Sequence, residues 1–207
     1  MVREMNNSGN QIAEFNNKIR TICEKYLIQF PDELEKLSRL MSLTKKPNID
    51  LRQRSTIPEG HVCASGIIIS PDKSKILMLE HKALGILVVP GGHYDLEDKT
   101  PDNAALREAR EETGLEGLAL HPWHQINGIP LDIDIHPIPA IPSKNEGAHV
   151  HYEFRFVLTV SYSEEIKLDP AESIGYEWVS MADVDKAWTI TAAIKKLSIL
   201  SSGPDHI

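Results

Sequence analysis

The chain has 207 residues, 41% of them hydrophobic, and a formal net charge of −8, which fits one ordinary domain with an extension. The acidic balance argues against nonspecific nucleic-acid binding, which needs a basic surface. No apolar run approaches the roughly 20 residues of a membrane span, and the polar N-terminus shows no secretory signal. The two cysteines, Cys23 and Cys63, lack metal-type spacing, so we expect both to be structural. We therefore expect a cytoplasmic protein without nucleic-acid or membrane partners.

The first fifty residues are predicted to form a helical extension. Apolar residues recur at helical spacing from Ile12 to Tyr26, and Pro31 precedes a second stripe of leucines. Such a pair of helices packs on the main domain or on a partner chain. Turn-forming residues then mark a linker. We therefore expect an extension over 1–50, a linker over 51–60 and the main domain over 61–207.

From His61 onward the pattern predicts strands. Residues 62–70 and 75–80 are apolar segments separated by a turn, which predicts a hairpin. Further strands are expected at 118–126, at 131–135 and, from the clearest alternation, at 150–160. A last helix is expected over 183–200. Helices packed on the faces of a sheet give an α/β/α layered fold.

The most informative segment is Arg107-Glu108-Ala109-Arg110-Glu111-Glu112-Thr113-Gly114-Leu115, downstream of the glycine pair Gly91-Gly92. Thr100 and Pro101 have the residue types of a helix start, and Gly114 that of a helix stop. The three glutamates stand at i, i+3 and i+4, where like charges repel, and near a C-terminus, where negative charge is unfavourable. Mg²⁺, which prefers oxygen ligands, would offset both effects. The alternative is a solvated acidic face on which Arg107 pairs with Glu111.

These residues resemble the signature of the Nudix, or MutT-like, hydrolases: Gly, five residues, Glu, seven residues, then Arg-Glu-apolar-any-Glu-Glu-any-Gly-apolar. The second half matches at every fixed position. In the first half, Gly92 is followed after five residues by Asp98, and eight residues separate Asp98 from Arg107. Asp98 thus stands in for the first glutamate, with Lys99 as an insertion. The chain is similar to a Gly-Gly-His subgroup with this variant signature.

The resemblance implies a Nudix-type α/β/α sandwich with a mixed sheet, and hydrolysis of a diphosphate linkage in a nucleoside diphosphate-X or related pyrophosphate by metal-activated water. It implies that Arg107 orients a glutamate and that Mg²⁺ or Mn²⁺ is held by Gly92, Glu108, Glu111 and Glu112. In many members a glutamate before the aromatic segment 176–179 adds a ligand or the general base. Glu172 is the candidate here and Glu177 the reserve.

Imidazole and carboxylate side chains alternate along two predicted strands. Asp132, Asp134 and His136 share one face, and His149, His151 and Glu153 share another. The functional interpretation is a wall that contacts substrate or a second metal site, because both side-chain types bind transition metals. The alternative is a polar exposed sheet face. The substrate-binding candidates are His93, Asp134, His136, His149 and His151.

Three functions remain open at this point. A diphosphate hydrolase fits the retained glutamates best. A non-catalytic Nudix-fold module that binds a nucleotide or a partner is suggested by the altered first half of the signature. Isopentenyl diphosphate isomerase is similar in fold, but it has a cysteine where this chain has Gly91. The residues do not identify the small-molecule diphosphate substrate, and a homodimer is compatible with them because such dimers are the commonest oligomers.

Overall fold

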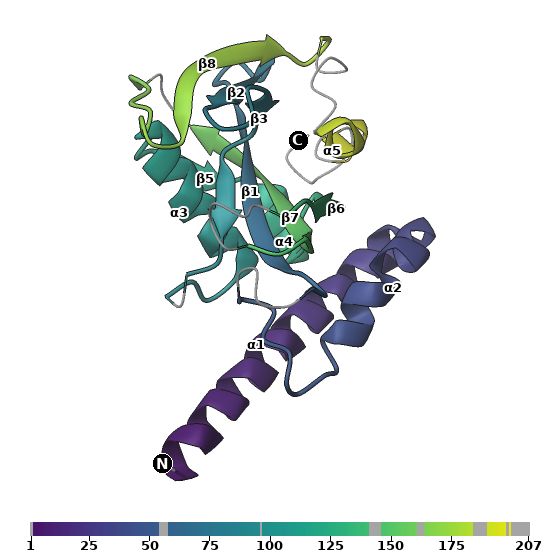
Figure 1. Ribbon diagram of the computed structural model, residues 1–207. Helices are drawn as coiled ribbons and strands as arrows, with labels where there is room; N and C mark the ends of the chain where they lie inside the picture. Colours follow the sequence, from purple (N-terminus) through teal and green to yellow (C-terminus); the bar gives the residue numbers. More distant parts are fainter. Residues whose placement is uncertain are drawn as a thin grey trace. The chain divides into compact units, whose positions relative to one another are not determined.

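The structure is a computed structural model and describes residues 2–53, 58–95, 97–140, 146–160, 164–183, 190–197 and 199 (Figure 1). The chain divides into two compact units. The first joins Met1–Cys63 to Asp134–Glu153, and the second joins Ala64–Ile133 to Phe154–Ile207.

The first unit contains the predicted pair of helices. Helix α1 (Val2–Gln29) is followed by the short 3-10 helix η1 (Pro31–Glu33) and by α2 (Leu34–Leu43), so the predicted pair of helices in the first fifty residues is confirmed. The Tyr26 hydroxyl donates a hydrogen bond to the Glu33 carboxylate at 2.8 Å. The Asn16 amide donates to the carbonyl of Ile49 at 2.6 Å. These bonds fasten α1 to η1 and to the segment that follows α2.

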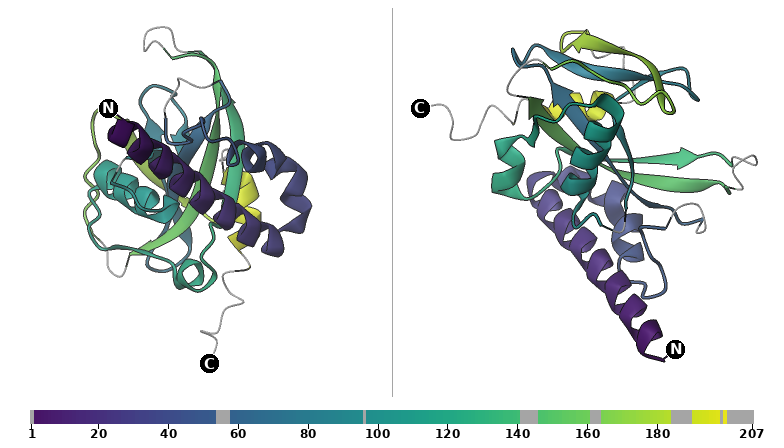
Figure 2. Two further views of the ribbon diagram at one scale, coloured as in Figure 1. Left: turned by 90° about the horizontal axis from the view of Figure 1, so that it is seen from below. Right: turned by 90° about the vertical axis from the view of Figure 1, so that its left-hand side faces the viewer.

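The strands form a single mixed sheet in the described part of the chain, which confirms the α/β class (Figure 2). The main path runs β3-β2-β1-β7-β5, while β4 pairs with β1, β6 with β7 and β8 with β2. The predicted hairpin of β1 and β2 is antiparallel and pairs Ile69 with Ile76. The strands are β1 (His61–Ile69), β2 (Lys75–His81), β3 (Leu87–Val88), β4 (Gly91–His93), β5 (Leu118–Leu120), β6 (Asp132–Ile138), β7 (His149–Val160) and β8 (Ser173–Ser180).

Helices cover both faces of the sheet in the second unit (Figure 1). Ile67 and Ile69 pack in one core with Ala193 of α5 (Thr191–Lys196). Ile68 packs in the other core with Ala109 of α3 (Pro101–Thr113). Neighbouring residues of one strand point to opposite faces, so β1 contributes to both cores. This is the expected layering of helix, sheet and helix.

Three element predictions differ from the structure. The strand expected over 118–126 ends at Leu120, and α4 (Pro122–Asn127) follows. The prediction for 122–126 is wrong because Pro122 starts a helix and the His121 imidazole accepts the Trp123 N–H. Strand β8 was not predicted. Of the last helix expected over 183–200, α5 covers Thr191–Lys196, and 184–189, 198 and 200 lie outside the described residues.

Among the described residues no helix is long and apolar enough to cross a bilayer. Cys23 and Cys63 are both buried.

Candidate functional site

Helix α3 carries the acidic residues in the second unit, and its ends lie where the sequence predicts. Thr100 is extended at the N-cap, with φ −148° and ψ 158°, and Pro101 is the first helical residue. The carbonyl of Thr100 accepts the N–H of Ala104, although its side chain makes no capping hydrogen bond within the described residues. Gly114 ends the helix in the left-handed region at φ 66°, where glycine is unstrained.

The glycine pair allows two glutamates to lie against the backbone of β4. A Cβ added at Gly92 would stand 2.6 Å from the Glu108 carboxyl carbon, so only glycine leaves room for that side chain. The N–H of Gly91 donates a hydrogen bond to Glu112 Oε1 at 2.9 Å. The turn and the helix are therefore built around these two carboxylates.

Arg107 links the loop before α3 to the acidic face. Its guanidinium donates to Asp98 Oδ2 and to the carbonyl of His93, both at 2.9 Å. It also lies 2.9 Å from Glu111 Oε2 and 3.1 Å from Glu108 Oε1. Burial opposes its charge, but Asp98 and Glu108 raise the pKa of Arg107 above its usual value. One arginine thus fixes the positions of three carboxylates.

Asp98, which occupies the variant position of the signature, faces the arginine. Its side chain is 6% exposed and forms its ion pair with Arg107. Asp98 Oδ2 also accepts the N–H of Asp95 at 2.9 Å. The carboxylate therefore closes the loop and holds the guanidinium in place.

The carboxylates on α3 have an electrostatic environment that suits a cation. Burial raises the pKa of Glu112 to about 7, against the hydrogen bond from Gly91, and the charges of Glu108, Glu172 and Asp169 add to the rise. Burial also raises the pKa of Glu108, and Arg107 opposes that rise. Glu111 is the exposed member of the set. Partly buried carboxylates that share a site ionise most easily beside a hard cation, so these residues fit Mg²⁺ or Mn²⁺.

Glu172 lies in a loop that is fastened to the end of α3. The N–H of Asp169 donates to the Glu112 carbonyl at 3.2 Å, and the N–H of Lys82 donates to the Glu172 carbonyl at 2.8 Å. The Glu172 side chain is exposed and close enough to Glu112 to raise its pKa. Glu177, the reserve candidate, is an exposed residue of β8 paired with Met78.

The first unit brings four of the substrate-binding candidates together, on β6 and β7. His136 Nδ1 lies 3.0 Å from Asp134 Oδ2, and His149 Nε2 lies 3.2 Å from His151 Nε2. The rings of His136 and His151 are 5.4 Å apart. The fifth candidate, His93, belongs to the second unit.

Asp132 does not share this environment, although it alternates with Asp134 in the sequence. It is fully buried in the second unit, where Lys196 Nζ lies 2.6 Å from its Oδ1 and Arg155 lies 3.6 Å from its Oδ2. Asp132 is therefore a buried ion-pair residue. The alternation along the strand does not reveal this role, because both cationic partners come from elements distant in the sequence.

Sequence reasoning missed two members of the histidine cluster. The His61 ring lies 4.9 Å from that of His149 and 4.6 Å from that of His151. Cys63 follows two residues later on the same strand. Cys63 lies in the apolar run 62–70, which indicated core, and His61 immediately precedes that run. The signal that could have found them is their spacing of two, which repeats the alternation on β7.

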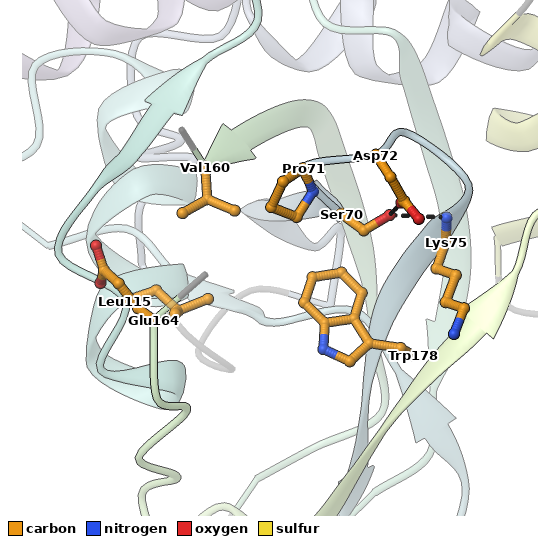
Figure 3. A pocket seen from close by; sticks show the side chains of 8 residues that line it. All are labelled: Ser70, Pro71, Asp72, Lys75, Leu115, Val160, Glu164 and Trp178. Atoms are coloured by element: carbon orange, nitrogen blue, oxygen red, sulfur yellow. Dashed lines mark hydrogen bonds between the residues drawn. The ribbon is translucent and has the colours of Figure 1, made fainter. Parts of the chain in front are cut away.

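A cavity of about 290 Å³ lies elsewhere in the second unit (Figure 3). The Trp178 indole faces the turn at its rim, where Asp72 accepts hydrogen bonds from Ser70 and Ser74. These bonds lower the pKa of Asp72 to about 2. The lining comprises Ser70, Pro71, Asp72, Lys75, Leu115, Val160, Glu164 and Trp178, none of which is an acidic residue of α3.

The comparisons agree with one another on the family and the fold. The family model of the NUDIX domain matches residues 60–198. The probable DHNTP pyrophosphohydrolase of Lactococcus lactis subsp. cremoris (strain MG1363) is 31% identical over 130 residues, which cover 63% of this chain and 72% of that protein. The fold is similar to that of a C. elegans Ap4A hydrolase, with a TM-score of 0.53 and 17% identity, over 69% of this chain and 98% of that one.

Proposed function

The chain belongs to the NUDIX family, and on that basis we propose that it is a pyrophosphohydrolase that requires Mg²⁺ or Mn²⁺. Its substrate is a small organic molecule with a diphosphate linkage, such as a nucleoside diphosphate joined to a further group. The observation that carries this proposal is the pair of carboxylates, Glu108 and Glu112, held against the glycine turn.

The metal would be held by oxygen ligands of α3 and the turn. Glu112 supplies a buried carboxylate, Glu108 a half-buried one, Glu111 an exposed one, and Gly92 a carbonyl. When bound, the metal neutralises charge on the phosphate oxygens and lowers the pKa of a bound water. The raised pKa values of Glu108 and Glu112 support this assignment, because a nearby cation restores the ionised form of each carboxylate.

The remaining residues of the site position these ligands and handle the proton. Arg107 orients Glu108 and Glu111 through its ion pairs, and Asp98 holds Arg107. Glu172 is exposed and lies near Glu112, so its carboxylate is placed to accept a proton from the attacking water. We assign Glu172 as the general base.

Several expectations from the sequence stay predictions. They include substrate contacts by His93 and by the cluster on β6 and β7, the division at 1–50, 51–60 and 61–207, the cytoplasmic location and the homodimer. The binding-module alternative is not favoured, because the chain retains all three glutamates of the signature.

The proposal is tested by a phosphate-release screen with Mg²⁺ and with Mn²⁺. The panel contains nucleotide sugars, dinucleoside polyphosphates, oxidised nucleotides, NAD and DHNTP. We expect turnover of at least one compound, loss of that turnover in Glu112→Gln, and full activity in Glu116→Gln, an exposed glutamate just beyond the helix. Nucleotide binding without turnover across the whole panel would replace the hydrolase with the binding module.

A further inference from the structure

A second set of metal-ligating side chains lies in the first unit, apart from the glutamates of α3. His61 and Cys63 come from β1, and His151 comes from β7, the strand next to β1 in the sheet. One ligand atom from each of these residues lies within 4.8 Å of the others. His61 and Cys63 differ by two positions, so they share one face of β1. The sheet therefore gathers two imidazoles and a thiol from segments nearly ninety residues apart.

The cluster is shielded from water. His61 is 0% exposed and Cys63 is 4% exposed, while His151 is partly buried.

His149 lies beside this cluster with its ring already oriented. Its Nδ1 lies 2.8 Å from the carbonyl oxygen of Gly147. Because a carbonyl only accepts, Nδ1 carries the proton and Nε2 carries a lone pair. That Nε2 lies 3.2 Å from His151 Nε2. A backbone carbonyl that fixes the tautomer of a histidine is the usual outer-shell support of a metal ligand.

The donor set selects the kind of metal. Imidazole nitrogen and thiolate sulfur suit Zn²⁺, whereas Mg²⁺ and Mn²⁺ prefer the oxygen ligands found on α3. With Zn–N bonds of about 2.0 Å and Zn–S bonds of about 2.3 Å, the ligand atoms of a tetrahedral site stand about 3.3–3.8 Å apart. The separation of the two Nε2 atoms, 3.2 Å, is close to that spacing. The ligand atoms of His61, Cys63 and His151 lie within 4.8 Å of one another.

We propose that His61, Cys63 and His151 form a binding site for one Zn²⁺ ion, with His149 as the fourth ligand. Four protein ligands make a closed site, which is typical of structural zinc. The ion would link β1 to the first residues of β7, through His149 and His151. Cys63 thereby gains a role beyond packing.

The test uses the full chain, stripped with a chelator and titrated with Co²⁺ as a spectroscopic substitute for Zn²⁺. Excess Mg²⁺ is present to occupy oxygen-ligand sites. We expect one Co²⁺ per chain, a cobalt–thiolate charge-transfer band in the near ultraviolet, and loss of the band when Zn²⁺ is added. Cys63→Ser should abolish the band. Cys23→Ser, which changes the chain's other buried thiol, should retain it.

The proposal is overturned by the lack of a cobalt–thiolate band in the stripped wild-type chain, or by a band that survives in Cys63→Ser. His151→Gln changes a partly exposed residue and gives a second variant if Cys63→Ser does not fold. It should weaken Co²⁺ binding at least ~10-fold without changing the far-ultraviolet circular dichroism. Unaltered Co²⁺ affinity in that folded variant also contradicts the site. Phosphate release is not part of this test, so its outcome is separate from that of the proposed hydrolase.

Discussion

The acidic face of α3 and the histidine cluster of the first unit are both groups of metal-ligating side chains, but they are built in opposite ways. The glutamates come from one turn of one helix, and the backbone of Gly91 and Gly92 fits against them. The histidines and Cys63 come from separate strands and meet only because the sheet aligns those strands. The first group offers oxygen ligands, and the second offers nitrogen and sulfur.

Burial has opposite consequences for metal binding in the histidine cluster and on the acidic face of α3. Burial keeps the imidazole of His151 neutral, which is its ligand form. Burial also favours the neutral form of Glu112, but a carboxylate must be ionised to bind a metal. A cation is therefore needed to complete the acidic site electrostatically, whereas burial already favours the neutral form of His151.

The largest effect is expected from Glu112→Gln. The amide oxygen can still accept the Gly91 N–H, so the turn is preserved while the charge is lost. Hydrolysis should fall by about 100-fold or more, as expected for loss of a metal ligand. Initial rates with saturating Mg²⁺ measure this fall. The cobalt–thiolate band should be unchanged, and its loss would mean that the two regions are coupled.

Substitutions in the glycine pair should separate activity from stability. In Gly92→Ala the new Cβ meets the mobile end of the Glu108 side chain, which can swing away. We expect activity to fall by roughly 10–100-fold with little change in thermal stability. In Gly91→Ala the Cβ clashes with Ser65 Cβ and stands 2.7 Å from the Ala64 carbonyl oxygen, so the fold itself should be destabilised. Equal melting temperatures for the two variants would contradict this distinction.

The same contrast explains how much could be predicted from the sequence. The limits of α3 and the crowding of its glutamates follow from local rules, namely Pro101 at the start and Gly114 at the end. Contacts between distant segments do not follow from such rules. The role of Asp132 depends on Lys196, 64 residues away. His61 belongs to the histidine cluster only through the pairing of β1 with β7.

Local rules also failed at one element because two of them competed. The apolar pattern of 118–126 favours a strand, but Pro122 fixes a helical φ and the His121 side chain caps the new helix. The sequence therefore predicts elements well where one signal dominates, and poorly where a proline and a cap interrupt an apolar run.

A smaller effect is expected from Arg107→Lys. Lysine keeps the positive charge but cannot contact Asp98, Glu111 and the His93 carbonyl at once. We expect a fall in kcat of about 10-fold, because Glu108 and Glu111 lose their common anchor. The matched control is Arg110→Lys, since Arg110 is exposed and donates to the Leu118 carbonyl. A KM effect without a kcat effect would assign Arg107 to substrate binding.

The smallest effects concern the pH dependence of stability without metal, and the two regions should have opposite signs. The folded pKa of His151, about 3, lies below its ordinary value of 6.5, so the unfolded chain binds more protons between these limits. Stability from this residue is lost as the pH falls from 6.5 toward 3.

The folded pKa of Glu112, about 7, lies above 4.5, so the folded chain binds more protons and stability is lost as the pH rises from 4.5 toward 7. Thermal unfolding in chelator should therefore change by a few degrees: His151→Gln flattens the acid limb, and Glu112→Gln flattens the slope toward neutral pH. Added Mg²⁺ should raise stability at pH 7 in the wild type and not in Glu112→Gln, because only the ionised carboxylate binds the cation. If Mg²⁺ stabilises both proteins equally, Glu112 is not a ligand, and the contrast between the two regions loses its electrostatic basis.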